Sequence, residues 1–398
     1  MNKTIMIVGA GIGQLPAILT AKRMGLKVIC VDKNSQALGM RSADLALSLD
    51  VIDIDGVLTA AKENKIDGIM TMQSDLPVKT VGAVVSALKL PGVNMETAEN
   101  CSNKIKTREC LAKYGVSQPK FFVVSSIHDA RKAVLEVGLP AIIKASDNSG
   151  SRGVVKIDSL DSLEKSFQEA MSYSRAGELL VEEYIEGVEL GAQAFSISGE
   201  CKQVFFHNDT MTKPPYMVPI GHSFPCNLEE IKLEKAKYEV VHSLEALGVT
   251  DGPSNIDLIL KKNGDVKIIE IGARIGATCL PELISYFTGI DWVEAAILTA
   301  VGKIPDLSIK THRPCAALVL EAPMDGVLIN FKIPEKVKLD PDLLEIEFTA
   351  NVGDQVNKLH KGTDRIGKVF VKGRTVQHAE EKASFLKSQV EIYVKPRD

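Results

Sequence analysis

The chain of 398 residues lacks the paired-cysteine spacings that build disulfide frameworks and zinc ribbons. Its seven cysteines are scattered between Cys30 and Cys315 with no CxxC, so we expect free thiols, and neither disulfides nor zinc. No run of lysine or arginine exceeds two residues, the formal net charge is -4 and the pI is near 6.1. These absences argue against a nucleic acid or an anionic membrane surface as partner and favour small ligands.

Long apolar runs are missing as well. No stretch reaches membrane-spanning length, and the first residues show no basic region followed by an apolar stretch and a cleavage site. We therefore expect a cytoplasmic protein with no membrane partner. The hydrophobic content of 45% and charged content of 25% are typical of globular proteins, and the length predicts two to four domains.

An alternation of strands and helices opens the chain. The pattern predicts a strand over residues 4–8, a glycine turn, a helix over 16–24 and a second strand ending at Asp32. This is a βαβ unit, and its continuation predicts a small parallel domain that ends near Pro91. Residues 98–114 are predicted to form one helix.

Shorter strands and helices follow, in an α+β pattern whose size suits a lid. A proline-rich loop is expected over 211–225, and a hairpin over 254–260 and 266–271, where Asn263-Gly264 accepts positive φ at both central positions. From about residue 313 a strand-rich tail with one late helix resembles a separate closing domain. The chain has no internal repeat and no low-complexity linker.

Two lysines forty residues apart are the first candidates for chemistry. Lys144 ends an apolar strand, and the small residues after it let backbone N–H groups approach phosphate oxygens. An ordinary hairpin loop with a surface lysine is the alternative, and Lys104 alone is typical of a solvent-facing helix. The phosphate-binding candidates are Lys104, Lys144, Ser146, Ser149, Gly150, Ser151 and Gly153.

An acidic stretch, Glu182 to Ile185, follows a short apolar run. We interpret it as an edge segment whose backbone pairs with adenine, while Tyr184 and Ile185 cover the base. Glu189 is then placed to accept hydrogen bonds from the ribose hydroxyls. The alternative is an exposed strand end that happens to carry Glu182 and Glu183.

Two acids occupy the two strands of the predicted hairpin. Asp257 and Glu270 lie in apolar settings, where an unpaired carboxylate is costly, and their oxygens suit Mg²⁺. Arg274 can stabilise charge on a transferred phosphoryl group; a salt bridge to one of these acids is the competing account. His222 can orient a substrate carboxylate or receive a proton, although a lone loop histidine more often does neither.

Together, residues 103–104, 143–146, 181–187 and 269–274 resemble the ATP-grasp superfamily, in its carboxylate–amine ligase branch related to L-amino-acid ligases, the pyrrolysine-pathway ligase and carbamoyl-phosphate-synthetase-like proteins. The resemblance covers residues 1–310. It implies an α/β and α+β ATP-grasp fold. Its parts are a Rossmann-like pre-ATP-grasp domain (1–97), a core (98–120 and 187–310), a mobile lid (121–186) and a C-terminal closing domain (311–398).

The resemblance also implies a reaction, in which ATP and a carboxylic acid give an acyl phosphate that an amine attacks. Lys104 and Lys144 would bind the phosphates, Glu182 to Ile185 the adenine, and Glu189 the ribose. Asp257 and Glu270 would hold Mg²⁺ or Mn²⁺, and Arg274 would act at the acyl phosphate. Relatives suggest a homodimer. Gly272 departs from the asparagine that many members carry at this position.

Three other functions compete with this one. A dinucleotide-dependent oxidoreductase is suggested by Gly9, Gly11 and Gly13 with Asp32, but the third glycine of the fingerprint should stand where Gln14 is. A non-catalytic nucleotide sensor would need fewer of the charged residues. A carboxylase or carbamoyl-type enzyme using bicarbonate is the nearest alternative, although the chain has neither a biotin-acceptor Met-Lys motif nor an amidotransferase domain.

Overall fold

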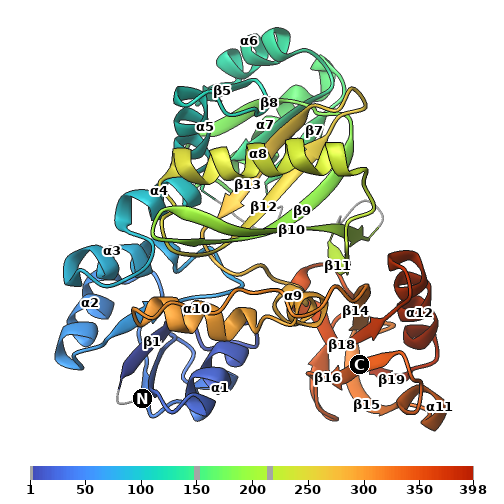
Figure 1. Cartoon of the computed structure of the whole chain (residues 1–398). Helices are drawn as coiled ribbons and strands as arrows, with labels where there is room; N and C mark the ends of the chain where they lie inside the picture. The colour runs from blue at the N-terminus through green and yellow to red at the C-terminus, as the bar shows by residue number, and fades with distance from the viewer. Residues whose placement is uncertain (1–2, 148–152, 213–217, 398) are drawn as a thin grey trace. The chain divides into compact units, whose positions relative to one another are not determined.

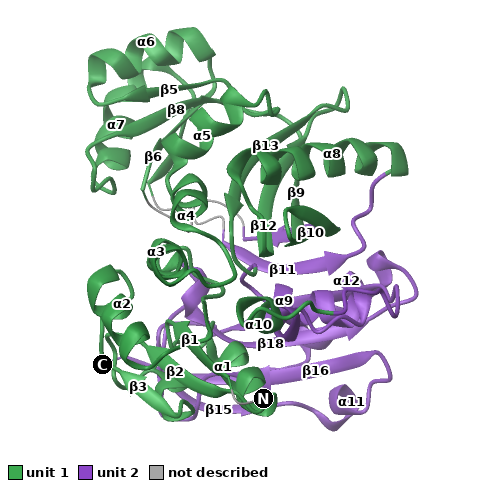
Figure 2. Cartoon of the chain, turned by 60° about the vertical axis from the view of Figure 1, so that its left-hand side comes forward, with its two compact units in different colours: residues 1–204, 229–275, 296–305 green, residues 205–228, 276–295, 306–398 purple. Residues whose placement is uncertain are grey.

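The computed structural model describes residues 3–147, 153–212 and 218–397. The chain divides into two compact units (Figure 2). The first consists of Met1–Val204, Glu229–Ile275 and Ala296–Pro305, and the second of Phe205–Leu228, Gly276–Ala295 and Asp306–Asp398.

The first unit opens with the predicted parallel sheet (Figure 1). Its strands run in the order β3-β2-β1-β4, and all three pairings are parallel. The elements are β1 (Thr4–Val8), α1 (Leu15–Arg23), β2 (Lys27–Val31), a 3-10 turn (Leu38–Arg41), β3 (Leu45–Leu47), α2 (Ile54–Glu63), β4 (Gly68–Met70) and α3 (Val78–Leu88). Buried aliphatic residues of the strands and of α2 and α3 form one core, as the βαβ pattern predicts.

The predicted single helix over 98–114 is wrong, because two helices stand there. α4 (Met95–Ser102) ends and α5 (Lys104–Lys113) begins at Asn103, whose backbone is extended with φ -114° and ψ 112°. The Asn103 side chain accepts hydrogen bonds from the backbone N–H groups of Ile105 and Lys106. Asparagine is a strong N-cap, so it starts a new helix instead of continuing the old one.

The next part of the first unit is a four-stranded antiparallel sheet, with strands in the order β5-β8-β6-β7. α6 packs on β5 and β8, while α7 packs on β6 and β7. The elements are β5 (Phe121–Val124), α6 (Ile127–Val137), β6 (Ala141–Ala145), β7 (Val154–Ile157), a 3-10 turn (Leu160–Ser162), α7 (Leu163–Met171) and β8 (Leu179–Glu183). The sheet and both helices share a separate apolar core.

A second antiparallel sheet in this unit contains the order β13-β12-β9, with α8 packed on β13. Its elements are β9 (Val188–Ile197), the first residues of β10 (Glu200–Met211), α8 (Glu230–Leu247), β12 (Gly252–Leu260) and β13 (Val266–Gly272). The β12–β13 hairpin is confirmed. Its turn differs from the prediction, since Gly264 has φ 86° but Asn263 does not have positive φ.

The second unit contains the order β11-β14-β18-β16, with the end of β10 paired to β11, and a small sheet β17-β15-β19. Its elements are β11 (Pro219–Phe224), α9 (Leu280–Thr288), the start of α10 (Trp292–Ala300), β14 (Cys315–Glu321), β15 (Gly326–Lys332), α11 (Glu335–Lys338), β16 (Leu343–Phe348), β17 (Gln355–Val356), a 3-10 turn (Gly362–Asp364), β18 (Arg365–Lys372), α12 (Val376–Ser388) and β19 (Glu391–Pro396). The loop predicted over 211–225 is therefore wrong in part, because 219–224 form β11. Proline stands only at the start of this strand and just beyond its end, where it does not interrupt the pairing.

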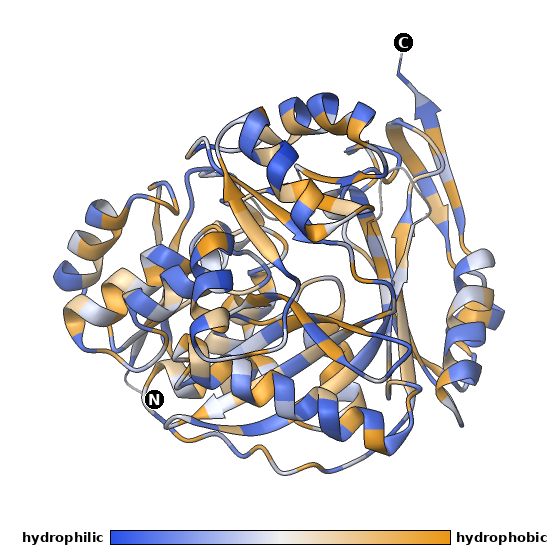
Figure 3. Cartoon of the chain, turned by 90° about the horizontal axis from the view of Figure 1, so that it is seen from above, coloured by the Kyte–Doolittle hydropathy of each residue, from blue (hydrophilic) through white to orange (hydrophobic). Residues whose placement is uncertain are grey.

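Helices throughout the chain carry hydrophobic and hydrophilic residues side by side (Figure 3), as helices with one buried face do. Within the described ranges, no single helix is long and apolar enough to cross a membrane. One bent pair, Leu280–Thr288 with Trp292–Ala300, meets the length and composition of a span across a bend of 105°.

Candidate active site

A buried group of three charged side chains lies at the centre of the site in the first unit. Glu182 Oε1 accepts from Arg108 Nε at 2.7 Å, and Glu182 Oε2 lies 2.8 Å from Lys144 Nζ. Side-chain exposure is 2% for Arg108, 6% for Lys144 and 4% for Glu182. Two cations share one anion, so the group carries an excess positive charge that an anionic ligand would neutralise.

The electrostatics of this group follow from its burial. Burial alone would raise the pKa of Glu182, but the charges of Arg108 and Lys144 outweigh it and lower that pKa to about 2. Burial lowers the pKa of Lys144 to about 8, and the repulsion of Arg108 and Lys104 acts in the same direction against the attraction of Glu182. Lys144 is therefore a cation at neutral pH that loses its proton in mildly alkaline solution.

Local structure explains how these side chains meet. Glu182 on β8 stands opposite Ile142 on β6, and Lys144 is two residues further along the same face. Arg108 lies one helical turn after Lys104 on α5, so that the two cations share a helix face. The sequence-based prediction did not include Arg108, although its position four residues after Lys104 indicates a shared helix face.

A second group of charges lies on the β12–β13 hairpin. Lys104 Nζ donates to Glu270 Oε1 at 3.1 Å, and Asp257 is the cross-strand partner of Glu270. The apolar setting expected for these acids is wrong, because Asp257 is exposed and the Glu270 side chain is 42% exposed. Open carboxylates on adjacent strands remain suited to a hard cation, which keeps part of its water shell.

Arg274 makes its ion pair with an aspartate that the sequence reading did not single out. Both its Nε and its Nη2 lie 2.8 Å from Asp75 Oδ1. The charge of Arg274 outweighs burial and lowers the pKa of Asp75, while Asp75, Asp257 and Glu270 together raise the pKa of Arg274 against its burial. Arg274 thus forms a salt bridge, as the competing account expected, but its partner is Asp75 and not Asp257 or Glu270.

Gly272 lies beside this ion pair. A Cβ atom at this position would lie 3.0 Å from Asp75 Oδ1 and 3.2 Å from Arg274 Cζ. Both contacts are tighter than ordinary van der Waals contact, so the missing side chain makes room for the Asp75–Arg274 pair. This is a structural reason for glycine at a position where many members of the resembled family carry asparagine.

The small-residue loop after Lys144 is described at its two ends. Ser146 is buried, its carbonyl accepts from the N–H of Lys104 at 2.9 Å, and its Oγ has no hydrogen-bond partner among the described residues. A buried hydroxyl without a partner suits a site for phosphate oxygens. Gly153 has φ 74° and its carbonyl accepts from Ala145 N–H. The candidates Ser149, Gly150 and Ser151 lie outside the described residues.

The interpretation of Glu182 as an edge segment is wrong. β8 is an inner strand, and Glu182 pairs with Phe121 on one side and with Ile142 on the other. Glu183 Oε2 accepts from the Lys120 N–H at 3.2 Å. A base could therefore meet the backbone only beyond the end of the strand.

The residues beyond this strand end remain candidates for the adenine contact. Tyr184 is exposed beneath Lys156, whose Nζ lies 4.7 Å from the ring centre, and Ile185 is buried. Glu189 lies on β9, opposite Ile259, with its side chain exposed.

The N-terminal glycine loop is occupied by its own side chains. Asp32 Oδ2 accepts from Ala10 N–H at 2.9 Å, and Gln14 Oε1 accepts from Gly11 N–H at 3.2 Å. A dinucleotide site needs the acid for a ribose and the loop amides for a pyrophosphate. The geometry thus weakens the oxidoreductase alternative.

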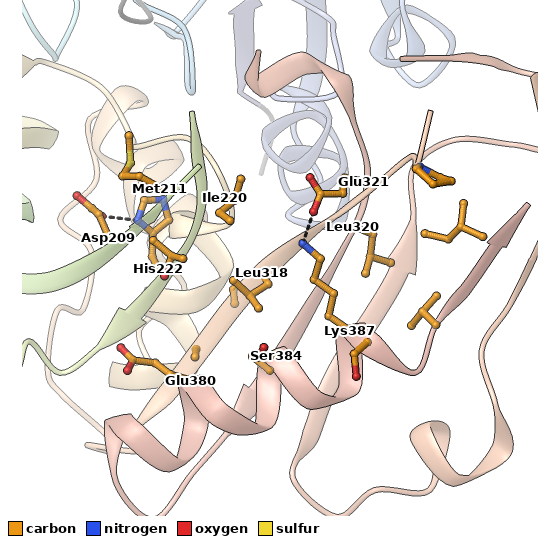
Figure 4. A pocket seen from close by; sticks show the side chains of 18 residues that line it. Asp209, Met211, Ile220, His222, Leu318, Leu320, Glu321, Glu380, Ser384 and Lys387 are labelled. Atoms are coloured by element: carbon orange, nitrogen blue, oxygen red, sulfur yellow. Dashed lines mark hydrogen bonds and ion pairs between the residues drawn. The ribbon is translucent and has the colours of Figure 1, made fainter. Parts of the chain in front are cut away.

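His222 belongs to the second unit, whereas the residues described above belong to the first. Asp209 Oδ1 lies 2.6 Å from its Nδ1, and burial lowers the pKa of His222 despite that carboxylate. Both residues line a cavity of about 940 Å³ (Figure 4). Met211, Leu318, Glu380 and Lys387 also line it, the last paired with Glu321.

The first unit contains two lysines, Lys104 and Lys144, and two open carboxylates, Asp257 and Glu270, which suit phosphate groups and a divalent cation. Comparison with known proteins gives the family. Residues 137–282 match the ATP-grasp domain, and residues 319–395 match the L-amino acid ligase C-terminal domain 2. The chain belongs to the ATP-grasp family of ATP-dependent ligases, and the family and fold class predicted from the sequence are confirmed.

Three solved structures are similar over nearly the whole chain. A phosphoribosylglycinamide synthetase from Anaerococcus prevotii is 30% identical with a TM-score of 0.85, and the match covers 99% of this chain and 100% of that one. An L-amino acid ligase from Bacillus licheniformis is 22% identical with a TM-score of 0.84 and 99% coverage of both chains. A 2-oxoglutarate carboxylase biotin carboxylase domain from Hydrogenobacter thermophilus is 19% identical with a TM-score of 0.81, covering 99% and 92%.

Two curated relatives match this chain over only part of their own length. An uncharacterized protein, y4rH, from Sinorhizobium fredii is 28% identical over 73% of this chain and 60% of its own length. The carbamoyl phosphate synthase large chain of Campylobacter jejuni is 26% identical over 75% of this chain but only 29% of its own length. The chain therefore spans less than two thirds of these relatives.

Proposed function

We propose that this protein is an ATP-dependent carboxylate–amine ligase that forms an amide or peptide bond on amino-acid-like substrates through an acyl phosphate. One observation carries the proposal: an excess of buried positive charge at Lys144 accompanies two open carboxylates, Asp257 and Glu270, in the same unit. The match of residues 319–395 to an L-amino acid ligase domain favours a ligase among ATP-grasp activities.

The residues fit ATP and a divalent cation. Lys104 and Lys144 would hold phosphate oxygens, and the unpartnered Ser146 hydroxyl would donate to one of them. Asp257 and Glu270 would hold Mg²⁺ or Mn²⁺, which supplies positive charge to the phosphate oxygens. We keep Glu183, Tyr184 and Ile185 as the proposed adenine segment, Ser149, Gly150, Ser151 and Gly153 as the proposed phosphate loop, and Glu189 as the proposed ribose contact.

The proposed reaction has two steps. A carboxylate oxygen attacks the γ-phosphorus and the bond to the β-phosphate oxygen breaks, which releases ADP. The amine nitrogen then attacks the acyl carbon, the carbon–oxygen bond to phosphate breaks, and the amine loses a proton. Lys144, Lys104 and Arg274 would stabilise the charge spread over the transferred group, and His222 is the proposed residue that orients the substrate or receives the proton.

A bicarbonate-using activity is the second candidate. The solved biotin carboxylase domain is described with MgADP and bicarbonate, and several relatives are carbamoyl phosphate synthase large chains. Both chemistries start with ATP and a carboxylate-like oxygen, so the lysines and acids would serve either one. The substrate that stimulates ADP release separates the two.

The deciding experiment follows ADP and hydroxamate formation with Mg²⁺, ATP, hydroxylamine and pools of amino acids and small carboxylic acids. ADP with a matching hydroxamate supports the ligase and names the acid. AMP formation contradicts an acyl phosphate, and bicarbonate-dependent ADP release without an acid requirement supports the second candidate. Lys144→Ala and Glu270→Ala should each abolish turnover, so substantial activity in both variants would contradict the site assignment.

The homodimer, the cytoplasmic location and the four domain boundaries expected from the sequence stay predictions. Small-molecule substrates agree with the family. The hydroxamate experiment identifies the acid, and the same ADP assay with that acid and a pool of amines in place of hydroxylamine identifies the amine.

A further inference from the structure

Two histidines and an aspartate meet on one face of the β10–β11 hairpin, within the second unit. His207 and Asp209 lie two residues apart on β10, so their side chains leave the same face of the strand. Asp209 stands directly opposite His222 on β11. Its Oδ1 lies 2.8 Å from Nδ1 of His207 and 2.6 Å from Nδ1 of His222.

We propose that His207, Asp209 and His222 form a binding site for a divalent transition-metal ion such as Zn²⁺ or Co²⁺. One ligand atom from each residue lies within 4.8 Å of the other two. Imidazole nitrogens and carboxylate oxygens bind such ions at about 2.0–2.2 Å, which places tetrahedral ligands roughly 3.3 Å apart. Small side-chain rotations on a rigid hairpin would widen the present hydrogen-bond distances to that spacing.

One ring nitrogen of His222 has no hydrogen-bond partner in the described part of the chain. His222 is 5% exposed, and its Nε2 has no hydrogen-bond partner among the described residues. A hydrogen-bonded histidine pair without metal explains the contacts of Asp209 but leaves this nitrogen unpaired, which is unfavourable when buried. Nδ1 of His222 faces Asp209 and is the nitrogen that would bind the ion, while Nε2 would keep its proton and could donate it to a small ligand.

The surroundings of the three residues suit an accessible site. Asp209 and His222 line the 940 Å³ cavity, where they lie side by side in Figure 4. His207 is buried, with its ring centre 5.4 Å from that of Phe224. Three protein ligands leave a tetrahedral ion one further position, which water or a small ligand can take from the cavity.

This inference modifies the sequence-based expectation of no zinc. That expectation rested on cysteine spacing, whereas the proposed ligands are imidazoles and a carboxylate. The signal was present as His207, Asp209 and His222, but the strand β11 that brings them together was read as a loop. The proposed ligands belong to the second unit, whereas Asp257 and Glu270, the proposed Mg²⁺ ligands, belong to the first.

The test is metal binding by the full-length protein, stripped of metal and kept in millimolar Mg²⁺ without ATP. We expect equilibrium dialysis to show one bound Zn²⁺ per chain, and Co²⁺ to give absorption bands of a low-coordinate site. His207→Gln, His222→Gln and Asp209→Asn should each weaken binding at least tenfold. His312→Gln is the matched control, since His312 is an exposed histidine of the same unit.

Three outcomes would overturn the proposal: no bound Zn²⁺, a cobalt–thiolate charge-transfer band, or equal affinity in the variants and the control. Thermal unfolding with and without Zn²⁺ gives a second readout, because a bound ion raises the Tm of the native chain. If a histidine variant fails to fold, the Zn²⁺ stoichiometry and cobalt spectrum of the native protein and the affinity of Asp209→Asn still test the proposed site. Metal binding is measured without turnover, so a failure of the metal-site proposal is distinguishable from a failure of the ligase proposal.

Discussion

Lys144 is a buried cation whose charge depends on pH just above neutrality. Burial lowers its pKa to about 8, below the usual lysine value, so the free protein loses this proton as the pH rises through 8. In the proposed site, phosphate oxygens would bind the charged form, and bound ATP would in turn hold the proton on Lys144. The proposal therefore links ATP affinity to this one protonation.

We expect the Kd for ATP to rise by up to about tenfold per pH unit above pH 8, because each unit removes most of the remaining charged form. In Lys144→Arg this alkaline rise should be absent, since a guanidinium stays charged. Calorimetric titration with ATP between pH 7 and 9.5 measures both proteins. An identical alkaline rise in the arginine variant would assign the proton to another group.

Glu182 is the anion that keeps two buried cations together. Glu182→Gln should lower the free energy of unfolding by about 3–5 kcal/mol at pH 7, because Arg108 and Lys144 remain buried without a counter-charge. Urea unfolding measures this. Glu183→Gln is the control, with an expected loss within about 0.5 kcal/mol, since the amide oxygen can still accept from Lys120 N–H.

The same residue predicts an acid limb of stability. The folded pKa of Glu182 is about 2, below the ordinary glutamate value of 4.5, so the unfolded chain binds the proton first. The stability it contributes is complete above pH 4.5 and is lost as the pH falls towards 2. The limb should be weaker in Glu182→Gln, and an equal acid dependence in both proteins would contradict it.

Residues in short motifs were predictable, whereas their distant partners were not. Lys104, Lys144 and Glu270 stand in local patterns that the chain displays directly. Asp75 meets Arg274 across 199 positions, and no local pattern marks it. Two predicted environments were wrong for related reasons. Glu182 lies on an inner strand, and the side chains of Asp257 and Glu270 are open to solvent, because tertiary packing decides both.

Among the elements, the break between α4 and α5 has the clearest consequence for the site. Asn103 ends one helix and caps the next, and Lys104 is the first residue of α5. The cap thus sets where Lys104 leaves the helix, next to the buried Ser146 carbonyl. The apolar pattern predicted helix here correctly, but it could not show that a polar side chain would divide it.

Asn103→Ala should cost about 1 kcal/mol of stability and also raise the Kd for ATP several-fold, because it frees the start of α5. Asn94→Ala is the matched control, since Asn94 caps α4 by accepting from Thr97 N–H. It should lose similar stability with little change in the Kd. Urea unfolding and ATP titration of both variants test this, and equal effects on the Kd would contradict a role for the Asn103 cap.

Turnover depends on several elements at once, since the proposed ATP and Mg²⁺ ligands extend from residue 104 to residue 274 and no single element contains them. Divalent-metal dependence tests whether they act together. The acids Asp257 and Glu270 are cross-strand partners, and Lys104 already donates to Glu270. Metal binding would therefore place a cation beside this lysine, and the phosphate charges of ATP would have to balance both.

Chelation of Mg²⁺ should abolish acid-dependent ADP formation, and added Mg²⁺ should restore it. Asp257→Asn and Glu270→Gln should each raise the Mg²⁺ concentration for half-maximal rate at least about tenfold, because each removes a charged oxygen ligand. Asp265→Asn is the control, since it removes the same charge from the turn of this hairpin. If all three variants need the same Mg²⁺ concentration as the native protein, the two acids do not hold the ion. If Asp257→Asn and Glu270→Gln raise the required Mg²⁺ concentration and Asp265→Asn does not, the ion binds between the strands β12 and β13.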